Sequence, residues 1–186
     1  MQQQRRRSGM ILGLLALGLL AGAALTTGSA QAASGVGPFL PESVWDRKLP
    51  ASTRFFVLTN WSSAAVLDKE TGLVWEKSPE TTPDTWSNAR FTCNTKNVGG
   101  RKGWRLPSFP ELASLIDPSV TPGPTLPTGH PFIDIQSLDY WSATTNVEIP
   151  TRAWDVNFGS GVVGDSTKTS TDLVWCVRGG MNADAY

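Results

Sequence analysis

Residues 71–75 (Thr-Gly-Leu-Val-Trp), 103–108 (Gly-Trp-Arg-Leu-Pro-Ser) and 174–180 (Val-Trp-Cys-Val-Arg-Gly-Gly) decide the fold that this sequence predicts. Each segment places a tryptophan beside an apolar, turn-forming or cationic residue. The run Leu-Val-Trp occurs at 73–75 and again at 173–175. We therefore expect the first and last segments to form strands of one sheet.

Short strands surround these segments. Apolar runs bounded by turn-forming residues predict the strands, and Gly72 supplies the positive φ of a hairpin turn between residues 64–67 and 73–76. Residues 118–131 hold five prolines and predict a long loop. With two short helices, the fold class is α+β. The predicted strands are residues 55–58, 64–67, 73–76, 140–142, 153–158, 162–163 and 173–177.

Two stretches carry signals for the start of a helix. Residues 82–84 (Thr-Pro-Asp) combine a capping oxygen, a proline and an acid. Ser108 and Glu111 have the spacing of a capping box and begin a second helix, which we expect to end at residues 117–118. The predicted buried positions are Trp86, Ala89 and Cys93 in the first helix and Leu112, Leu115 and Ile116 in the second.

The first 32 residues are a predicted signal peptide. Three arginines at residues 5–7 precede an uncharged apolar run at 10–25, and a small-x-small cleavage site follows at 30–32. The apolar run is shorter than the roughly 20 residues that span a bilayer, which favours cleavage over a membrane anchor. These residues do not decide between export by the Sec pathway and export by the twin-arginine pathway. The predicted boundaries are 1–32 for the signal peptide, 33–52 for an extended arm, 53–182 for the domain and 183–186 for a tail.

Cleavage changes the charge of the chain. The sequence has 16 basic and 16 acidic residues, and removal of the arginines at 5–7 leaves 13 basic residues and a net charge of −3. Nucleic-acid binding needs a basic surface, so the composition disfavours a nucleic-acid partner. We predict an exported protein, periplasmic or extracellular, with no stable membrane span after cleavage.

Cys93 and Cys176 are the two cysteines of the chain. An even cysteine count in an exported protein favours a disulfide. A reactive thiol and a metal ligand are the alternatives, but the single histidine, His130, and the lack of a close cysteine pair disfavour zinc. We predict no metal and no cofactor, and expect His130 to be an exposed residue of the 118–131 loop.

The landmark segments, taken in order, resemble an exported bacterial domain family named for the C-terminal domain of the Legionella collagen-like adhesin. The resemblance covers residues 64–180 and implies a C-type-lectin-like fold, in which a small twisted antiparallel sheet is flanked by two short helices and long loops. It implies a helix-to-last-strand disulfide, which Cys93 and Cys176 fit, and a non-catalytic module of a kind that binds glycan and trimerises. The landmarks are residues 68, 71–75, 86, 89, 93, 103–108, 111–112, 140–142, 153–154, 156, 158 and 176–180.

A cationic stretch supplies the first candidate ligand contacts. Lys96, Arg101 and Lys102 are candidate contacts for a sulfated or acidic glycan, because their cationic groups pair with sulfate and carboxylate. A solvated loop is the alternative. Arg105 belongs to the Trp-Arg-Leu-Pro landmark, and we expect it to bond a carboxylate or a carbonyl inside the domain.

Three further residues are candidates for ligand binding. Most tryptophans lie in predicted strands or landmarks, where core packing is favoured, so Trp61 is the one we expect to contact a ligand or a partner. Asp155 and Asn157 offer oxygen ligands of the kind that calcium accepts. The favoured alternative places both on the solvent face of the strand at 153–158.

Three functions remain open. The first is an exported, non-catalytic module that recognises glycan or another cell-surface polymer, as in adhesion. The second is a structural subunit that docks onto an envelope protein or forms a homotrimer. The third is an oxidase like the formylglycine-generating enzymes, which share this fold type and require reactive cysteines. The chain offers no recognisable catalytic triad, so we predict that it is not an enzyme.

Overall fold

The computed structural model describes residues 49–180, all within the compact unit Pro41–Tyr186. The predicted signal peptide, most of the predicted arm (33–48) and the tail lie outside the described residues. Within residues 49–180, no helix is both long and apolar enough to cross a bilayer. The elements are α1 (Ala51–Arg54), β1 (Phe55–Val57), η2 (Thr59–Trp61), β2 (Ala65–Asp68), β3 (Val74–Glu76), β4 (Asp84–Thr85), α2 (Trp86–Thr95), β5 (Trp104–Arg105), α3 (Phe109–Ala113), β6 (Asp139–Thr145), β7 (Arg152–Asn157), β8 (Val163–Thr167), β9 (Thr171–Asp172) and β10 (Val177–Arg178).

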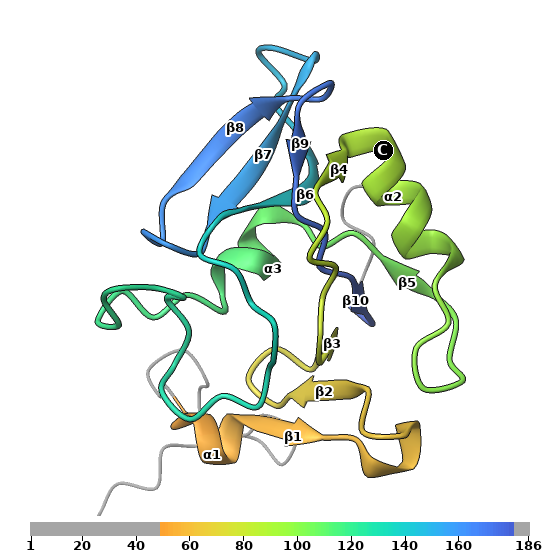
Figure 1. Ribbon diagram of the computed structural model, residues 1–186, viewed down its shortest axis with the longest axis vertical. Helices are drawn as coiled ribbons and strands as arrows, with labels where there is room; N and C mark the ends of the chain where they lie inside the picture. The colour runs from red at the N-terminus through yellow and green to blue at the C-terminus, as the bar shows by residue number, and fades with distance from the viewer. Residues whose placement is uncertain (1–48, 181–186) are drawn as a thin grey trace, which may run out of the picture. The chain divides into compact units, whose positions relative to one another are not determined.

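A five-stranded antiparallel sheet joins the three landmark segments (Figure 1). Its strand order is β1-β2-β3-β10-β5, so β3 and β5, from the first two segments, both pair with β10, from the last. This confirms that the first and last segments share a sheet. The predicted last strand at 173–177 is wrong in extent, because residues 174–176 lie between β9 and β10 where the chain passes from one sheet to another.

Side chains of this sheet alternate between two faces. Trp75 and Arg105 share one face through their common neighbour on β10, and Trp104 and Arg178 share the other. The Trp75 face packs with α3, and the Trp104 face packs with α2. The adjacent residues of the Trp-Arg landmark therefore serve opposite sides of the sheet.

Two smaller sheets complete the α+β fold. β6, β7 and β8 form a three-stranded antiparallel sheet, which confirms the predicted strands at 140–142 and 153–158. The return strand reaches Thr167, further than predicted. β4 and β9 form a two-stranded ribbon beside α2 (Figure 1).

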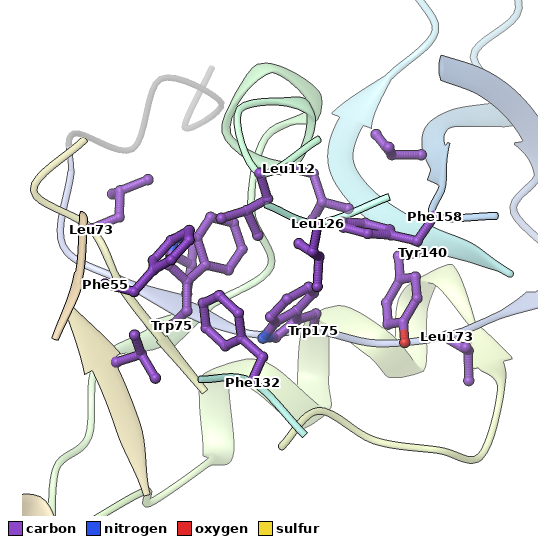
Figure 2. Packing of buried hydrophobic residues seen from close by; sticks show 14 of the residues in the cluster. Phe55, Leu73, Trp75, Leu112, Leu126, Phe132, Tyr140, Phe158, Leu173 and Trp175 are labelled. Atoms are coloured by element: carbon purple, nitrogen blue, oxygen red, sulfur yellow. The ribbon is translucent and has the colours of Figure 1, made fainter. Parts of the chain in front are cut away.

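The larger core cluster is built around Trp175 (Figure 2). Its ring lies 4.9 Å from that of Phe132 and 5.5 Å from those of Trp75 and Phe158, measured between centroids. The Trp175 indole N–H donates to the Glu76 carbonyl at 2.9 Å, so its polar atom is satisfied in the interior. This cluster ties the five-stranded sheet to the three-stranded one.

The second cluster lies under α2 and contains the disulfide. Trp86, Ala89 and Cys93 are buried, as the periodicity predicted. The Cys93–Cys176 bond is present, with a Cα–Cα separation of 5.4 Å, and confirms the predicted pairing. The helix begins at Trp86 rather than at 82–84, because Asp84 and Thr85 pair with β9 instead.

The second predicted helix is α3. The capping box is present: the Ser108 N–H donates to Glu111 Oε2 at 2.8 Å. Leu112 and Leu115 are fully buried. The helix ends at Ala113, earlier than the predicted 117–118, and its last turn tightens as the Leu115 N–H donates to the Leu112 carbonyl.

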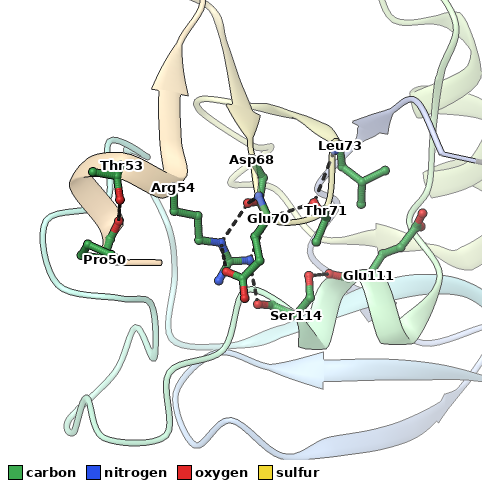
Figure 3. A network of polar contacts seen from close by, with 9 residues as sticks. All are labelled: Pro50, Thr53, Arg54, Asp68, Glu70, Thr71, Leu73, Glu111 and Ser114. Carbon is green, nitrogen blue, oxygen red and sulfur yellow. Dashed lines mark hydrogen bonds and ion pairs between the residues drawn. The ribbon is translucent and has the colours of Figure 1, made fainter. Parts of the chain in front are cut away.

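The buried side chain of Arg54 joins α1 to β2 and to the end of α3 (Figure 3). Arg54 Nε and Nη2 donate to the two carboxylate oxygens of Asp68 at 2.9 and 2.7 Å, and Nη2 also donates to the Ser114 carbonyl at 2.9 Å. Arg54 belongs to α1, which begins at Ala51, within the last two residues of the predicted arm.

Candidate functional site

Trp61 ends η2, in the connection between β1 and β2. Ser62 and Ser63 follow with φ of 54° and turn the chain back toward β2. The Trp61 ring packs edge-on against Trp104, with centroids 6.5 Å apart and planes at 83°. Trp61 is therefore half-buried, anchored on the α2 face of the five-stranded sheet with part of its surface open to solvent.

Two guanidinium groups lie beside this ring. Arg101 Cζ is 5.5 Å and Arg178 Cζ is 5.4 Å from the centroid of Trp61, within the range of a cation–π contact. Among the ion pairs of residues 49–180, neither arginine is matched with a carboxylate. Within residues 49–180, both guanidinium groups therefore lack a carboxylate partner.

Backbone contacts fix the two arginines. Arg178 extends from β10 on the same sheet face as Trp104, and its Nε donates to the Lys102 carbonyl at 2.9 Å. The Arg101 carbonyl accepts the Trp104 indole N–H at 2.7 Å. The Lys102 side chain is exposed beside them. We call Trp61, Arg101, Lys102 and Arg178 the Trp61 cluster.

Gly99 lets the loop after α2 rest directly on Trp61. A Cβ at this position would lie 2.5 Å from the Trp61 carbonyl oxygen and 2.6 Å from its Cβ, and Gly99 has φ of +58°. A larger residue would push the two segments apart. The geometry of the Trp61 cluster therefore depends on a glycine.

Lys96 lies apart from the cluster. Its Nζ is 2.5 Å from Glu76 Oε1 and 2.7 Å from Glu80 Oε1, and the side chain is 15% exposed. Burial lowers the pKa of Lys96, but the two carboxylates more than offset this, so the pKa is raised. The ammonium group of this predicted ligand contact is therefore paired with two carboxylates of the protein itself.

Arg105 is structural, as predicted. Its Nη1 and Nη2 donate to the two carboxylate oxygens of Glu111 at 2.7 and 2.6 Å, and Nη2 also donates to the Gly179 carbonyl at 2.8 Å. Burial raises the pKa of Glu111, but the hydrogen bonds from Arg105 and Ser108 outweigh it and hold the pKa low. The landmark arginine thus joins β5, α3 and the end of β10.

Asp155 and Asn157 lie on β7, in the three-stranded sheet, and not with Trp61. The predicted solvent face is wrong for Asp155, whose exposed fraction is 4%, because α2 packs with Trp141 and Ala153 on that face. Asn157 closes the turn after β7: its Oδ1 accepts from the Gly159 N–H at 2.9 Å, and its Nδ2 donates to Asp139.

Acidic side chains gather around Asp155. Burial, together with the charges of Asp155 and Asp139, raises the pKa of Asp172 to about 6. Burial also raises the pKa of Asp155. In the part of the chain that the structure describes, no group of three or more His, Cys, Asp or Glu side chains is arranged to hold a metal ion.

His130 differs from its prediction as an exposed loop residue. Its ring stacks on Phe132 with centroids 5.8 Å apart, and it is half-buried. Burial lowers its pKa.

The sequence matches the family described as the Lcl C-terminal domain over residues 64–178, more than half of the chain. The chain belongs to this family. A search of curated proteins finds no match. Arg101, Lys102 and Arg178 fall inside the matched residues. Trp61 lies three positions before the match begins at residue 64. The Lcl C-terminal domain thus contains the cations of the Trp61 cluster, and the preceding β1–η2 segment supplies its ring.

Positive charge is segregated within this Lcl C-terminal domain. Residues 85–110 contain no aspartate or glutamate, although the whole chain has 16 acidic residues. Of the five cations in this run, Lys96 and Arg105 bind carboxylates from elsewhere in the chain. Arg90, Arg101 and Lys102 form no ion pair with the carboxylates of residues 49–180.

Trp61, Arg101 and Lys102 are candidate ligand contacts from the sequence, whereas Arg178 is not and belongs only to the last landmark segment. Its place beside Trp61 depends on the pairing of β10 with β5, which sets Arg178 opposite Trp104. A strand register between segments so far apart has no local signal in the sequence.

Proposed function

We propose that this Lcl C-terminal domain protein is an exported, non-catalytic module that binds an anionic glycan through the Trp61 cluster. The observation that supports it is the pair of guanidinium groups at 5.5 and 5.4 Å from the Trp61 ring, with no carboxylate partner within residues 49–180.

The chemistry of the cluster suits a sulfated or uronic sugar. An indole ring offers a flat apolar surface for the face of a sugar ring. Guanidinium groups pair with sulfate or carboxylate in bidentate geometry, and the exposed Lys102 adds an ammonium. A neutral glycan would leave these cations unused, so an anionic one is the better fit.

The rest of the chain supports export. The Cys93–Cys176 disulfide is typical of proteins in oxidising compartments. With it we propose cleavage of a signal peptide at 1–32, a domain from 53 to 182, and a C-type-lectin-like arrangement of the α+β fold. Because the bond uses both cysteine sulfurs, the thiol chemistry of a formylglycine-generating oxidase is disfavoured.

A docking or homotrimeric role is the second candidate. Leu138, Val162 and Val163 are exposed apolar residues at one end of the β6–β7–β8 sheet. Exposed apolar residues at one end of a sheet favour a protein partner. Light scattering of the exported protein decides this point, since a monomer at high concentration would contradict a homotrimer.

Heparin affinity tests the first proposal. We expect the exported protein to bind immobilised heparin at low salt, and the variant Arg101→Gln/Arg178→Gln to elute much earlier. Trp61→Ala should also weaken binding by removing the stacking surface.

Lys69→Gln is the matched control, because Lys69 also lies over an exposed aromatic ring, that of Phe56 at 5.4 Å. It removes the same kind of contact outside the Trp61 cluster. If Lys69→Gln and the double arginine variant lower retention equally, with both proteins folded, general charge explains the binding and the cluster does not.

A further inference from the structure

Two cationic side chains also lie over the ring of Trp86, at the start of α2, whereas the loop with Arg101 follows the end of this helix. Arg90 Cζ lies 4.7 Å and Lys168 Nζ lies 4.2 Å from the centroid of Trp86. Trp86 is the first residue of α2, and its indole N–H donates to the Ser142 carbonyl at 2.8 Å. The ring is therefore fixed, and the two cations share its surface.

These two charges have no counterion in the described part of the protein. Neither Arg90 nor Lys168 is among the residues that pair with carboxylates within 49–180. Burial and the charge of Arg90 lower the pKa of Lys168, and two like charges over one ring repel each other. An anionic group bound by both would relieve that repulsion.

Lys168 is held in place by the loops around it. Its Nζ donates to Thr145 Oγ1 and to the Pro150 carbonyl, both at 2.9 Å. The two acceptors lie at the end of β6 and in the connection from β6 to β7, while Lys168 itself follows β8. Within residues 49–180 the Arg90 side chain forms no such bond, and it is exposed, so it can adjust to a ligand.

Both cationic groups flank the same helix. Trp86 and Arg90 lie in its first half, and Arg101 and Lys102 lie in the loop that follows it. The ten residues of α2 span about 15 Å. The helix and the loop contain no acidic residue, so no negative charge of their own separates the two groups.

We propose that Arg90 and Lys168 form a second anion subsite over Trp86, and that the ligand is a linear polyanion long enough to reach both it and the Trp61 cluster. This rests on the proposed function and adds a length requirement to it. A short anionic fragment occupies one subsite at a time, whereas a long chain engages both and gains affinity through the linkage.

The experiment compares two heparin fragments, a tetrasaccharide and a dodecasaccharide, binding to the exported protein in a calorimeter at low salt. The test variant is Arg90→Gln/Lys168→Gln, and the control is Lys69→Gln/Lys77→Gln, which removes the same charge elsewhere. We expect the test variant to bind the dodecasaccharide roughly tenfold or more weakly, as the loss of charge-assisted bonds predicts, and to bind the tetrasaccharide within about twofold of wild type.

The outcomes separate the two proposals. If wild type binds neither fragment, the proposed function fails and this subsite fails with it. If the long fragment binds, but the test variant and the control weaken it equally, the second subsite is wrong while the first stands. Equal weakening of both fragments by the test variant also overturns the length requirement. Circular dichroism checks that each variant is folded.

Discussion

Lys96 is a candidate ligand contact in the sequence but an internal ion-pair partner in the structure. In the sequence it is one of five cations in an acid-free run. In the structure its ammonium group lies against Glu76, whose exposed fraction is 3%, and Glu80. Its role is therefore to compensate a buried carboxylate beside the disulfide, since Glu76 Oε2 also accepts the Cys176 N–H at 2.9 Å.

Replacement of Lys96 should lower the free energy of unfolding, and a second substitution at Glu76 should restore part of the loss. Lys96→Met leaves the Glu76 carboxylate buried without its main cation, and we expect a loss of about 3 kcal/mol in the free energy of unfolding. The double variant Glu76→Gln/Lys96→Met should recover a large part of that loss, because no buried charge remains. Urea denaturation measures both. Strict additivity of the two single changes would contradict the pairing.

Asp172 predicts a pH dependence of stability. Its pKa is raised from 3.8 to about 6 by burial and by the charges of Asp155 and Asp139. The folded protein therefore binds this proton more tightly than the unfolded chain does. The stability contributed by the proton is complete below pH 3.8 and is lost as the pH rises through about 6.

The variant Asp172→Asn removes this titration. We expect it to be more stable relative to wild type at pH 7.5 than at pH 4.5, by roughly 1–2 kcal/mol after allowing for solvent screening of a half-buried group. Denaturant unfolding at the two pH values gives the comparison. An equal difference at both values would show that Asp172 is not the group responsible.

At the scale of elements, the loop after α2 and the η2 turn form one unit. Residues 98–101 close a tight turn through paired backbone bonds between Val98 and Arg101, and Gly99 of that turn contacts the Trp61 backbone. The loop therefore sets the position of both Arg101 and the Trp61 ring.

Two neighbouring glycines allow a matched test of this contact. Gly99→Ala places a Cβ 2.5 Å from the Trp61 carbonyl oxygen, while Gly100→Ala meets nothing within 4 Å, and both residues have positive φ. We expect Gly99→Ala to lower the free energy of unfolding by roughly 2–4 kcal/mol and Gly100→Ala by about 1 kcal/mol. Gly99→Ala should also weaken heparin binding. Similar losses in both variants would mean that backbone strain, and not the Trp61 contact, sets the cost.

Across the whole molecule, the disulfide links α2 to the residue just before β10 of the five-stranded sheet. Its two cysteines are 83 residues apart. In the loop-entropy description, closing a loop of this length stabilises the folded state by about 4–5 kcal/mol. Both sulfurs lie in the smaller core cluster, next to Ala89 and Trp104.

Removal of the bond should therefore lower stability without changing the site. We expect Cys93→Ala/Cys176→Ala to lose about 3–5 kcal/mol and to keep heparin binding at temperatures where it stays folded. Thermal unfolding and heparin retention measure the two effects. Loss of binding in a folded variant would show that the bond also holds the Trp61 cluster together.

Local patterns were sufficient for most elements. The capping box at Ser108, the buried face of Trp86, Ala89 and Cys93, and the hairpin around Gly72 involve residues within a few positions of each other, so nearby sequence specifies them. Boundaries were less predictable. Asp84 and Thr85 have helix-start chemistry yet pair with β9, because a strand partner from the far end of the chain competes for their backbone.

The sequence by itself determined the α+β class, the shared sheet of the first and last landmark segments, and the disulfide partners, and it offered Trp61, Arg101 and Lys102 as separate candidate contacts. Only the tertiary structure decided which cations lack a carboxylate partner within residues 49–180. Glu76 and Glu111 neutralise Lys96 and Arg105 from other elements, while the register of β10 brings Arg178 to Trp61. The reason is physical: short-range signals fix the backbone locally, but the partner of a charge depends on which segments the sheet places side by side.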